Sequence, residues 1–214
     1  ARGTLSNMVP EVDQFTLGSY LVPFVDRLID RPKSAHIRAL FQRVYAELSA
    51  DPVFAQAGST MNVAYGELWG AQPRNDHLYR YPPTPKTFVE RRPVVLFLHG
   101  SAGNFLGYLW VLKRFADAHG WTIIAPDNAF GFWRPDAAHQ AIDRAVRYIA
   151  DQPDLDASRI VLAGLSNGGL GVHHALSHGR HRFEAVVLFS AVPAPKMAPH
   201  PSDAPWFVLH GDAD

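Results

Sequence analysis

The sequence contains no cysteine, which excludes disulfides, thiolate nucleophiles and cysteine-ligated metal sites. It has no excess of charge of either sign, because Lys and Arg number 20 and so do Asp and Glu. That balance gives no electrostatic argument for a nucleic-acid partner or an anionic membrane surface. No apolar run is long enough to span a membrane. Metal-ligand spacings, phosphate-binding loops and dinucleotide fingerprints are also lacking, so we expect no metal and no cofactor.

Neither end of the sequence carries a recognisable targeting segment. The chain begins at Ala1 without a methionine and stops at Asp214, directly after a strand-like segment. Both ends read as cut points. The compartment therefore stays open between the cytoplasm and a secreted or periplasmic location with a lost signal segment, and the oligomeric state is unknown.

The apolar pattern divides the chain into residues 1–60 and 61–214. In the first part, Ser34 is a candidate N-cap of a helix, and a weaker helix covers 15–29. The apolar stripe of the helix after Ser34 consists of Ile37, Leu40, Phe41, Val44, Tyr45 and Leu48. The first part is therefore predicted to be an N-terminal helical extension. At the start of the second part, residues 61–68 and 77–81 have the pattern of a strand hairpin.

From residue 93 onward, strand patterns alternate with helix patterns. Continuous apolar runs, typical of buried strands, cover 94–98, 121–125, 160–163, 185–189 and 206–210. Helical patterns cover 104–118, 136–151 and 169–178, and the first of these is expected to bury Leu106, Leu109, Trp110 and Phe115. This alternation predicts a mostly parallel sheet with helices on both faces.

One segment has the residues of a catalytic turn. Gly164-Leu165-Ser166-Asn167-Gly168 fits G-x-S-x-G and lies between a buried strand and a helix. A sharp turn there holds the serine in strained backbone geometry with its Oγ exposed. The following helix directs its positive end at the serine, which favours developing negative charge. A chance match is the alternative, but the placement favours Ser166 as a nucleophile.

A second glycine-containing segment, residues 98–104, follows the first strand of the alternating region. Acyl transfer requires backbone N–H groups directed at the oxygen of the tetrahedral intermediate. A His-Gly loop after this strand supplies one donor, and the residue after the nucleophile supplies the other. Ser101 and Asn167 are therefore the candidate donors. An ordinary strand-to-helix turn is the alternative, since glycine-rich turns are common.

Together these segments resemble the α/β-hydrolase superfamily. The likeness is carried by VVLFLHGSAGN at 94–104, RIVLAGLSNGG at 159–169 and WFVLHGDAD at 206–214. Within the superfamily the chain is similar to the esterase branch, which includes phospholipase/carboxylesterase, dienelactone-hydrolase and polyhydroxyalkanoate-depolymerase-like enzymes. The resemblance implies an α/β-hydrolase fold for residues 61–214.

The resemblance also implies a catalytic triad in the order Ser, acid, His. Similar esterases carry His-Gly-x-x-Asp after a late strand, which maps the acid onto Asp214, with Asp212 as the alternative. The histidine is expected beyond residue 214, after one further strand, so the domain is expected to be incomplete and C-terminally truncated. His99 is expected to brace the oxyanion loop rather than to act as the base.

The implied function is that of a carboxylesterase-like serine hydrolase. Such an enzyme cleaves a small-molecule ester through an acyl-enzyme on Ser166 and needs no cofactor. A peptidase or acyltransferase on the same fold, and a non-catalytic binding protein, are the alternatives. The aromatic residues at 130–133 either line a substrate pocket or pack as a loop.

Overall fold

The computed structural model divides the chain into two compact units, residues 1–62 and 63–214. The structure describes residues 11–25, 29–52, 78–83, 91–101, 106–128, 131–191 and 204–211. The first unit contains helices α1 (Glu11–Val25) and α2 (Arg31–Ala50), and the second contains a sheet with three helices. Among these residues, no helix combines the length and the apolar character needed to cross a bilayer.

Helix α2 begins earlier than the sequence pattern predicted. Asp30 is its N-cap and accepts a 2.8 Å hydrogen bond from the Lys33 N–H. Ser34, the predicted cap, lies inside the helix, where its buried hydroxyl donates to the Ser19 carbonyl of α1. The predicted cap was therefore wrong, because Ser34 serves the packing of α1 against α2 instead.

The stripe predicted for α2 is only partly buried. Tyr45 and Leu48 are buried, whereas Leu40 is 45% exposed. The helix therefore packs through its C-terminal half more than through its middle.

The second unit is built on one six-stranded sheet. Its strands are β1 (Leu78–Tyr81), β2 (Arg92–Leu98), β3 (Thr122–Pro126), β4 (Leu155–Leu165), β5 (Ala185–Phe189) and β6 (Trp206–Leu209). Their order across the sheet is β1-β3-β2-β4-β5-β6, with β1 antiparallel to β3 and every other pair parallel. The predicted strand at 77–81 thus pairs with β3, while its predicted hairpin partner at 61–68 lies outside the described residues.

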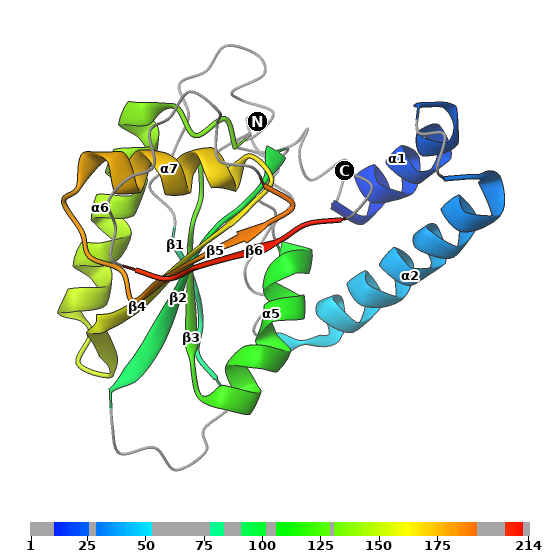
Figure 1. The fold of residues 1–214 in the computed structure, drawn as a ribbon. Coiled ribbons are helices and arrows are strands. Elements are labelled where there is room, and N and C mark those ends of the chain that lie inside the picture. Colours follow the sequence, from blue (N-terminus) through cyan, green and yellow to red (C-terminus); the bar gives the residue numbers. More distant parts are fainter. Residues whose placement is uncertain are drawn as a thin grey trace, which may run out of the picture. The chain divides into compact units, whose positions relative to one another are not determined.

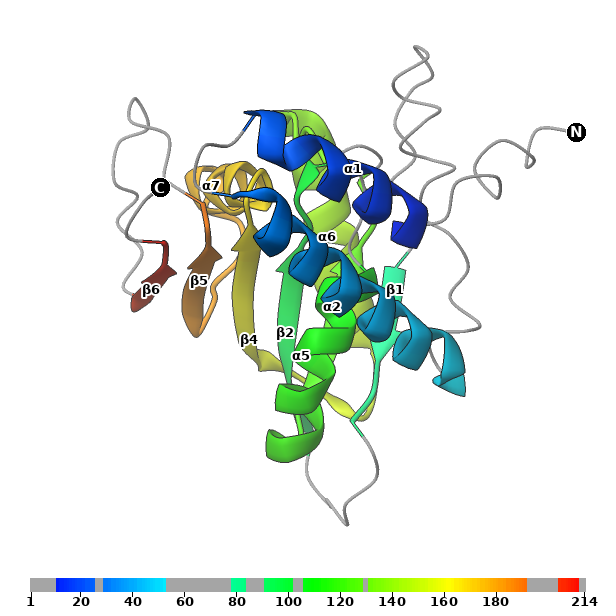
Figure 2. The same ribbon diagram turned by 90° about the vertical axis from the view of Figure 1, so that its right-hand side faces the viewer.

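Helices cover both faces of this sheet. α6 (Pro135–Asp151) and α7 (Gly168–His178) pack on one face, and α5 (Leu106–His119) packs on the other (Figures 1 and 2). The core between the sheet and α6 includes Leu96, Leu162, Ile142 and Ile149, all at most 1% exposed. The predicted mostly parallel sheet with helices on both faces is confirmed.

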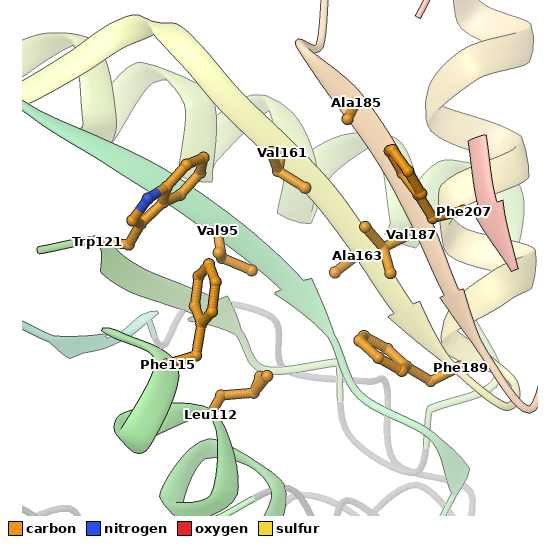
Figure 3. A pocket seen from close by; sticks show the side chains of 10 residues that line it. All are labelled: Val95, Leu112, Phe115, Trp121, Val161, Ala163, Ala185, Val187, Phe189 and Phe207. Carbon is orange, nitrogen blue, oxygen red and sulfur yellow. The ribbon is translucent and has the colours of Figure 1, made fainter. Parts of the chain in front are cut away.

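The face that carries α5 has an apolar cavity of about 340 Å³ (Figure 3). The strands contribute Val95, Val161, Ala163, Ala185, Val187, Phe189 and Phe207 to its lining, and Leu112, Phe115 and Trp121 complete it. Phe115, predicted to be inward, is 41% exposed because α5 packs through the neighbouring Leu109 and Ala116. The side chains of β6 are also exposed, at 36% for Trp206 and 53–54% for the next three residues.

The parallel pairing of β2 with β4 determines where polar residues can meet. Phe97 is paired with Ala163, and Leu98 with Gly164. The segment after Leu98 therefore emerges beside the segment after Leu165, at the carboxyl ends of the two strands. Ligand sites of open α/β sheets lie at this edge.

Candidate active site

Ser166 occupies a sharp turn between β4 and α7. Its φ is +50°, a conformation that is uncommon for residues other than glycine, and its side chain is exposed. The Ser166 N–H donates to the Phe189 carbonyl of β5 at 2.9 Å, and the Gly169 N–H donates to the Ser166 carbonyl at 2.9 Å. The turn is therefore fixed from both sides, and its hydroxyl is presented to solvent.

The two glycines that flank this turn are required by close backbone contacts. A Cβ on Gly164 would lie 2.7 Å from the Gly168 carbonyl oxygen. A Cβ on Gly168 would lie 2.1 Å from the Leu98 carbonyl oxygen of β2. The G-x-S-x-G pattern thus reflects packing of α7 directly against the ends of β2 and β4.

The loop after β2 lies against this turn. A Cβ on Gly100 would be 3.3 Å from both the Leu165 carbonyl oxygen and the Ser166 Cβ. Ser101 is exposed, and its Oγ accepts a 2.7 Å hydrogen bond from Asn167 Nδ2. The structure therefore brings Ser101, Ser166 and Asn167 together, whereas Asp214 and Asp212 lie outside the described residues.

Asn167 also marks the start of α7. It is the N-cap residue, but its side chain makes no capping hydrogen bond, because the amide is directed to Ser101 instead. The positive end of the helix dipole is thus located at Ser166 and Asn167. An anion at this position would be stabilised by the helix terminus.

A buried network supports the Ser101 loop, and the sequence indicated only its His99. His99 is fully buried, and its Nε2 accepts a hydrogen bond from the Asn128 N–H at 3.1 Å. The ring proton therefore lies on Nδ1, which donates to the Gly100 carbonyl at 2.7 Å. The Trp133 indole donates to the His99 carbonyl at 2.8 Å. The expectation that His99 braces this loop agrees with these contacts.

Comparison with known proteins points to esterases. No family model matches the chain. Feruloyl esterase B of Neurospora crassa is 28% identical over 138 residues, which cover 58% of this chain and 47% of that protein. The crystal structure of a thermostable esterase matches with a TM-score of 0.51 and 22% identity, over 62% of this chain and 42% of that one. The chain has an α/β-hydrolase fold.

The expected fold and the expected resemblance to the esterase branch are thereby confirmed. A poly(3-hydroxybutyrate) depolymerase from Bordetella parapertussis is also similar, at 26% identity and a TM-score of 0.43, over 51% of this chain and 44% of that one. The sequence relative is named a feruloyl esterase, in agreement with the expected carboxylesterase-like hydrolase. The chain spans less than half the length of each of these three proteins.

Histidines of α6, of α7 and of the segment after α7 make contacts that join these parts of the hydrolase domain. The His139 and His178 rings stack with centroids 4.0 Å apart, and His139 Nε2 donates to the His174 carbonyl at 3.1 Å. His181 Nε2 is 2.6 Å from Asp143 Oδ1. These side chains hold α7 to α6. Within the described ranges, no three histidine or acidic side chains are placed to hold a metal ion.

The stability of the hydrolase domain is expected to fall on acidification, chiefly because of His99. Burial lowers the pKa of His99 from 6.5 to about 4. Below pH 6.5 the unfolded chain binds a proton there that the folded protein does not, so the free energy of unfolding decreases as pH decreases. The loss should reach at most about 3 kcal/mol near pH 4. Urea unfolding at pH 7.5, 5.5 and 4.5 measures it.

His99→Asn is the matched variant for this measurement. The amide can replace the Nδ1 donor but does not titrate, so the variant should be less stable at pH 7.5 and lose less on acidification. The variant should still lose some stability as the pH falls, because the pKa of His174 is also lowered, chiefly by burial and further by the neighbouring His173 and His139. If the variant and the parent lose equal stability between pH 7.5 and pH 4.5, protonation of His99 is not the cause of the loss.

Proposed function

We propose that this chain provides the nucleophile and the oxyanion hole of a serine carboxylesterase. The Ser166 Oγ attacks the carbonyl carbon of an ester, the alcohol leaves, and water releases the acid from the acyl-enzyme. The N–H groups of Ser101 and Asn167 stabilise the anionic oxygen of each tetrahedral intermediate. No cofactor takes part in these steps.

One observation carries the proposal: the exposed Ser166, held at a φ of +50°, lies against Gly100 of the β2 loop. A strained, exposed serine at the N-terminus of a helix has no evident structural purpose, and strain of this kind is concentrated at functional sites. The Asn167–Ser101 hydrogen bond supports it further, because it joins the residues that carry the two proposed donors.

The proposed base and acid complete a triad with Ser166. The base is a histidine beyond residue 214, oriented by Asp214. His99 is unsuited to the role, because it is fully buried and both of its ring nitrogens are engaged within the protein. A general base must reach the proton that it accepts, directly or through one water.

Covalent labelling of the full-length protein tests this proposal. A fluorophosphonate probe should react once per chain, and peptide mapping by mass spectrometry should find the adduct on Ser166. Labelling should be blocked by prior incubation with a slowly hydrolysed ester. An unlabelled protein, or an adduct on a different serine, would contradict the assignment.

A substrate panel distinguishes the esterase from the other activities of this fold. We expect turnover of short p-nitrophenyl esters, and the panel should include methyl ferulate because a sequence relative is named a feruloyl esterase. Peptide p-nitroanilides should be cleaved far more slowly. Faster cleavage of the anilides would indicate a peptidase, and transfer of the acyl group to an added alcohol in preference to water would indicate an acyltransferase.

A further inference from the structure

Trp133 has a backbone conformation that a bulky side chain rarely adopts. Its φ is +45°, and its side chain is completely buried. For a large residue this region of φ is a genuine outlier and is retained only where the surroundings enforce it. Gly131, two residues before it, has a φ of +85°, so the chain makes an unusual bend shortly before α6.

The contacts of Trp133 join two segments that are distant in the sequence. Its indole N–H donates to the His99 carbonyl at 2.8 Å, and its ring centroid is 5.3 Å from that of His99. On the other side, a Cβ on Gly171 of α7 would lie 2.9 Å from Trp133 Cδ2. One side chain therefore contacts both the loop that leads to Ser101 and the helix that begins at Asn167.

The neighbouring residues reinforce the same loop. The Gly131 N–H donates to the Asn128 carbonyl at 2.8 Å, and the Asn128 N–H donates to His99 Nε2. A Cβ on Gly131 would lie 2.3 Å from the Gly100 carbonyl oxygen. Asn128, Gly131 and Trp133 thus all contact the segment that precedes Ser101.

We propose that Trp133 is a positioning residue for the oxyanion hole. It holds the Ser101 loop and α7 at the separation at which the N–H groups of Ser101 and Asn167 converge on a single oxygen. This inference rests on the proposed function of that site. The requirement is strict because an oxyanion hole stabilises charge through donors fixed in advance at about 2.7–3.1 Å from the developing oxyanion.

The direct test is Trp133→Phe in the full-length protein. The variant keeps an aromatic ring but loses the N–H that holds the His99 carbonyl. We expect kcat for p-nitrophenyl esters to fall about tenfold while KM stays within about twofold, since the N–H donors that Trp133 positions act in the transition state. Trp121→Phe is the matched control, because Trp121 lies beside the apolar cavity near α5; its kcat should be unchanged.

A trifluoromethyl ketone provides a readout that a merely structural role would not change. Ser166 adds to its carbonyl and forms an anionic tetrahedral adduct that needs the oxyanion hole, whereas the corresponding secondary alcohol has no carbonyl and forms no adduct. In Trp133→Phe, affinity for the ketone should fall by the same factor as kcat/KM, and affinity for the secondary alcohol should not change. Unchanged kcat and ketone affinity in a folded variant would overturn the proposal.

A folding defect of the variant and a failure of the proposed function can each be distinguished from a failure of the role of Trp133. If thermal denaturation shows that Trp133→Phe is unfolded, benzothienylalanine at position 133, in which sulfur replaces the N–H, decides the matter by the same two readouts. If the parent protein neither turns over esters nor labels at Ser166, the proposed function itself fails. If the parent is active and the variants match it, only the role of Trp133 fails.

Discussion

Replacing Ser166 by alanine is expected to lower kcat/KM for ester hydrolysis by about 10⁴-fold or more. The change removes the atom that we propose forms the acyl-enzyme, and the proposed oxyanion hole alone would recover only a small part of the rate. Labelling by a fluorophosphonate should disappear at the same time. Initial rates on p-nitrophenyl butyrate, measured with both proteins at equal concentration, give the ratio.

The chain offers a closely matched control for that change. Ser190 is also an exposed serine with a positive φ, +43°, and it follows β5, the strand next to β4. Its N–H donates to the Leu209 carbonyl at 2.8 Å. Ser190→Ala should retain turnover and labelling. If Ser190→Ala lost activity and Ser166→Ala retained it, the nucleophile would be Ser190, after β5, and the assignment of Ser166 would be wrong.

Gly168→Ala is expected to destabilise the hydrolase domain by at least about 3 kcal/mol. The added Cβ would lie 2.1 Å from the Leu98 carbonyl oxygen and 3.0 Å from the His99 carbonyl oxygen. Both are backbone atoms of β2 and its loop, so relief requires α7 to move away from the sheet. Alanine favours helices over glycine by about 1 kcal/mol, so a loss of stability would isolate the steric effect. Urea unfolding at pH 7.5 provides the measurement.

Gly179→Ala supplies the comparison for this variant. Gly179 is the C-cap of the same helix, with a φ of +64° and no atom within 4 Å of an added Cβ. It should cost only about 1 kcal/mol, from the left-handed backbone alone. Equal losses in the two variants would mean that the contact between α7 and β2 does not control the stability.

The sequence predicted the elements of the second unit well because each has a strong local pattern. Continuous apolar runs identified β2, β3 and β5, and the Gly residues around Ser166 are fixed by contacts that leave no room for a side chain. The start of α2 was misjudged although its signal was present. Asp30 is followed by a proline in the first turn, which is a common helix start, and Asp30 rather than Ser34 is the N-cap.

The support of the candidate site could not be predicted in the same way. By their sequence, the aromatic residues at 130–133 fit either a substrate pocket or a packed loop, and Phe130 lies outside the described residues. Trp133 is packed, yet its partner is a backbone carbonyl, that of His99. Any carbonyl can accept from an indole, so no residue type in the sequence indicates the pair. The contact between Trp133 and the His99 carbonyl follows only from the sheet order. Because β3 lies next to β2, the segment after β3 is brought to the loop after β2.

The separation of the site residues along the chain has a consequence for folding. Ser101 and Asn167 are 66 positions apart, and they meet only when β4 docks parallel to β2 after the chain has crossed over through β3 and α6. Such non-local pairing is slow, because the entropy of closing the intervening segment is lost before the contacts form. Collapsed intermediates in which α6 and α7 have formed would therefore be chemically inert. The proposed reactivity toward esters would appear only after β2 and β4 have paired, which would make it a stricter reporter of correct folding than helix content.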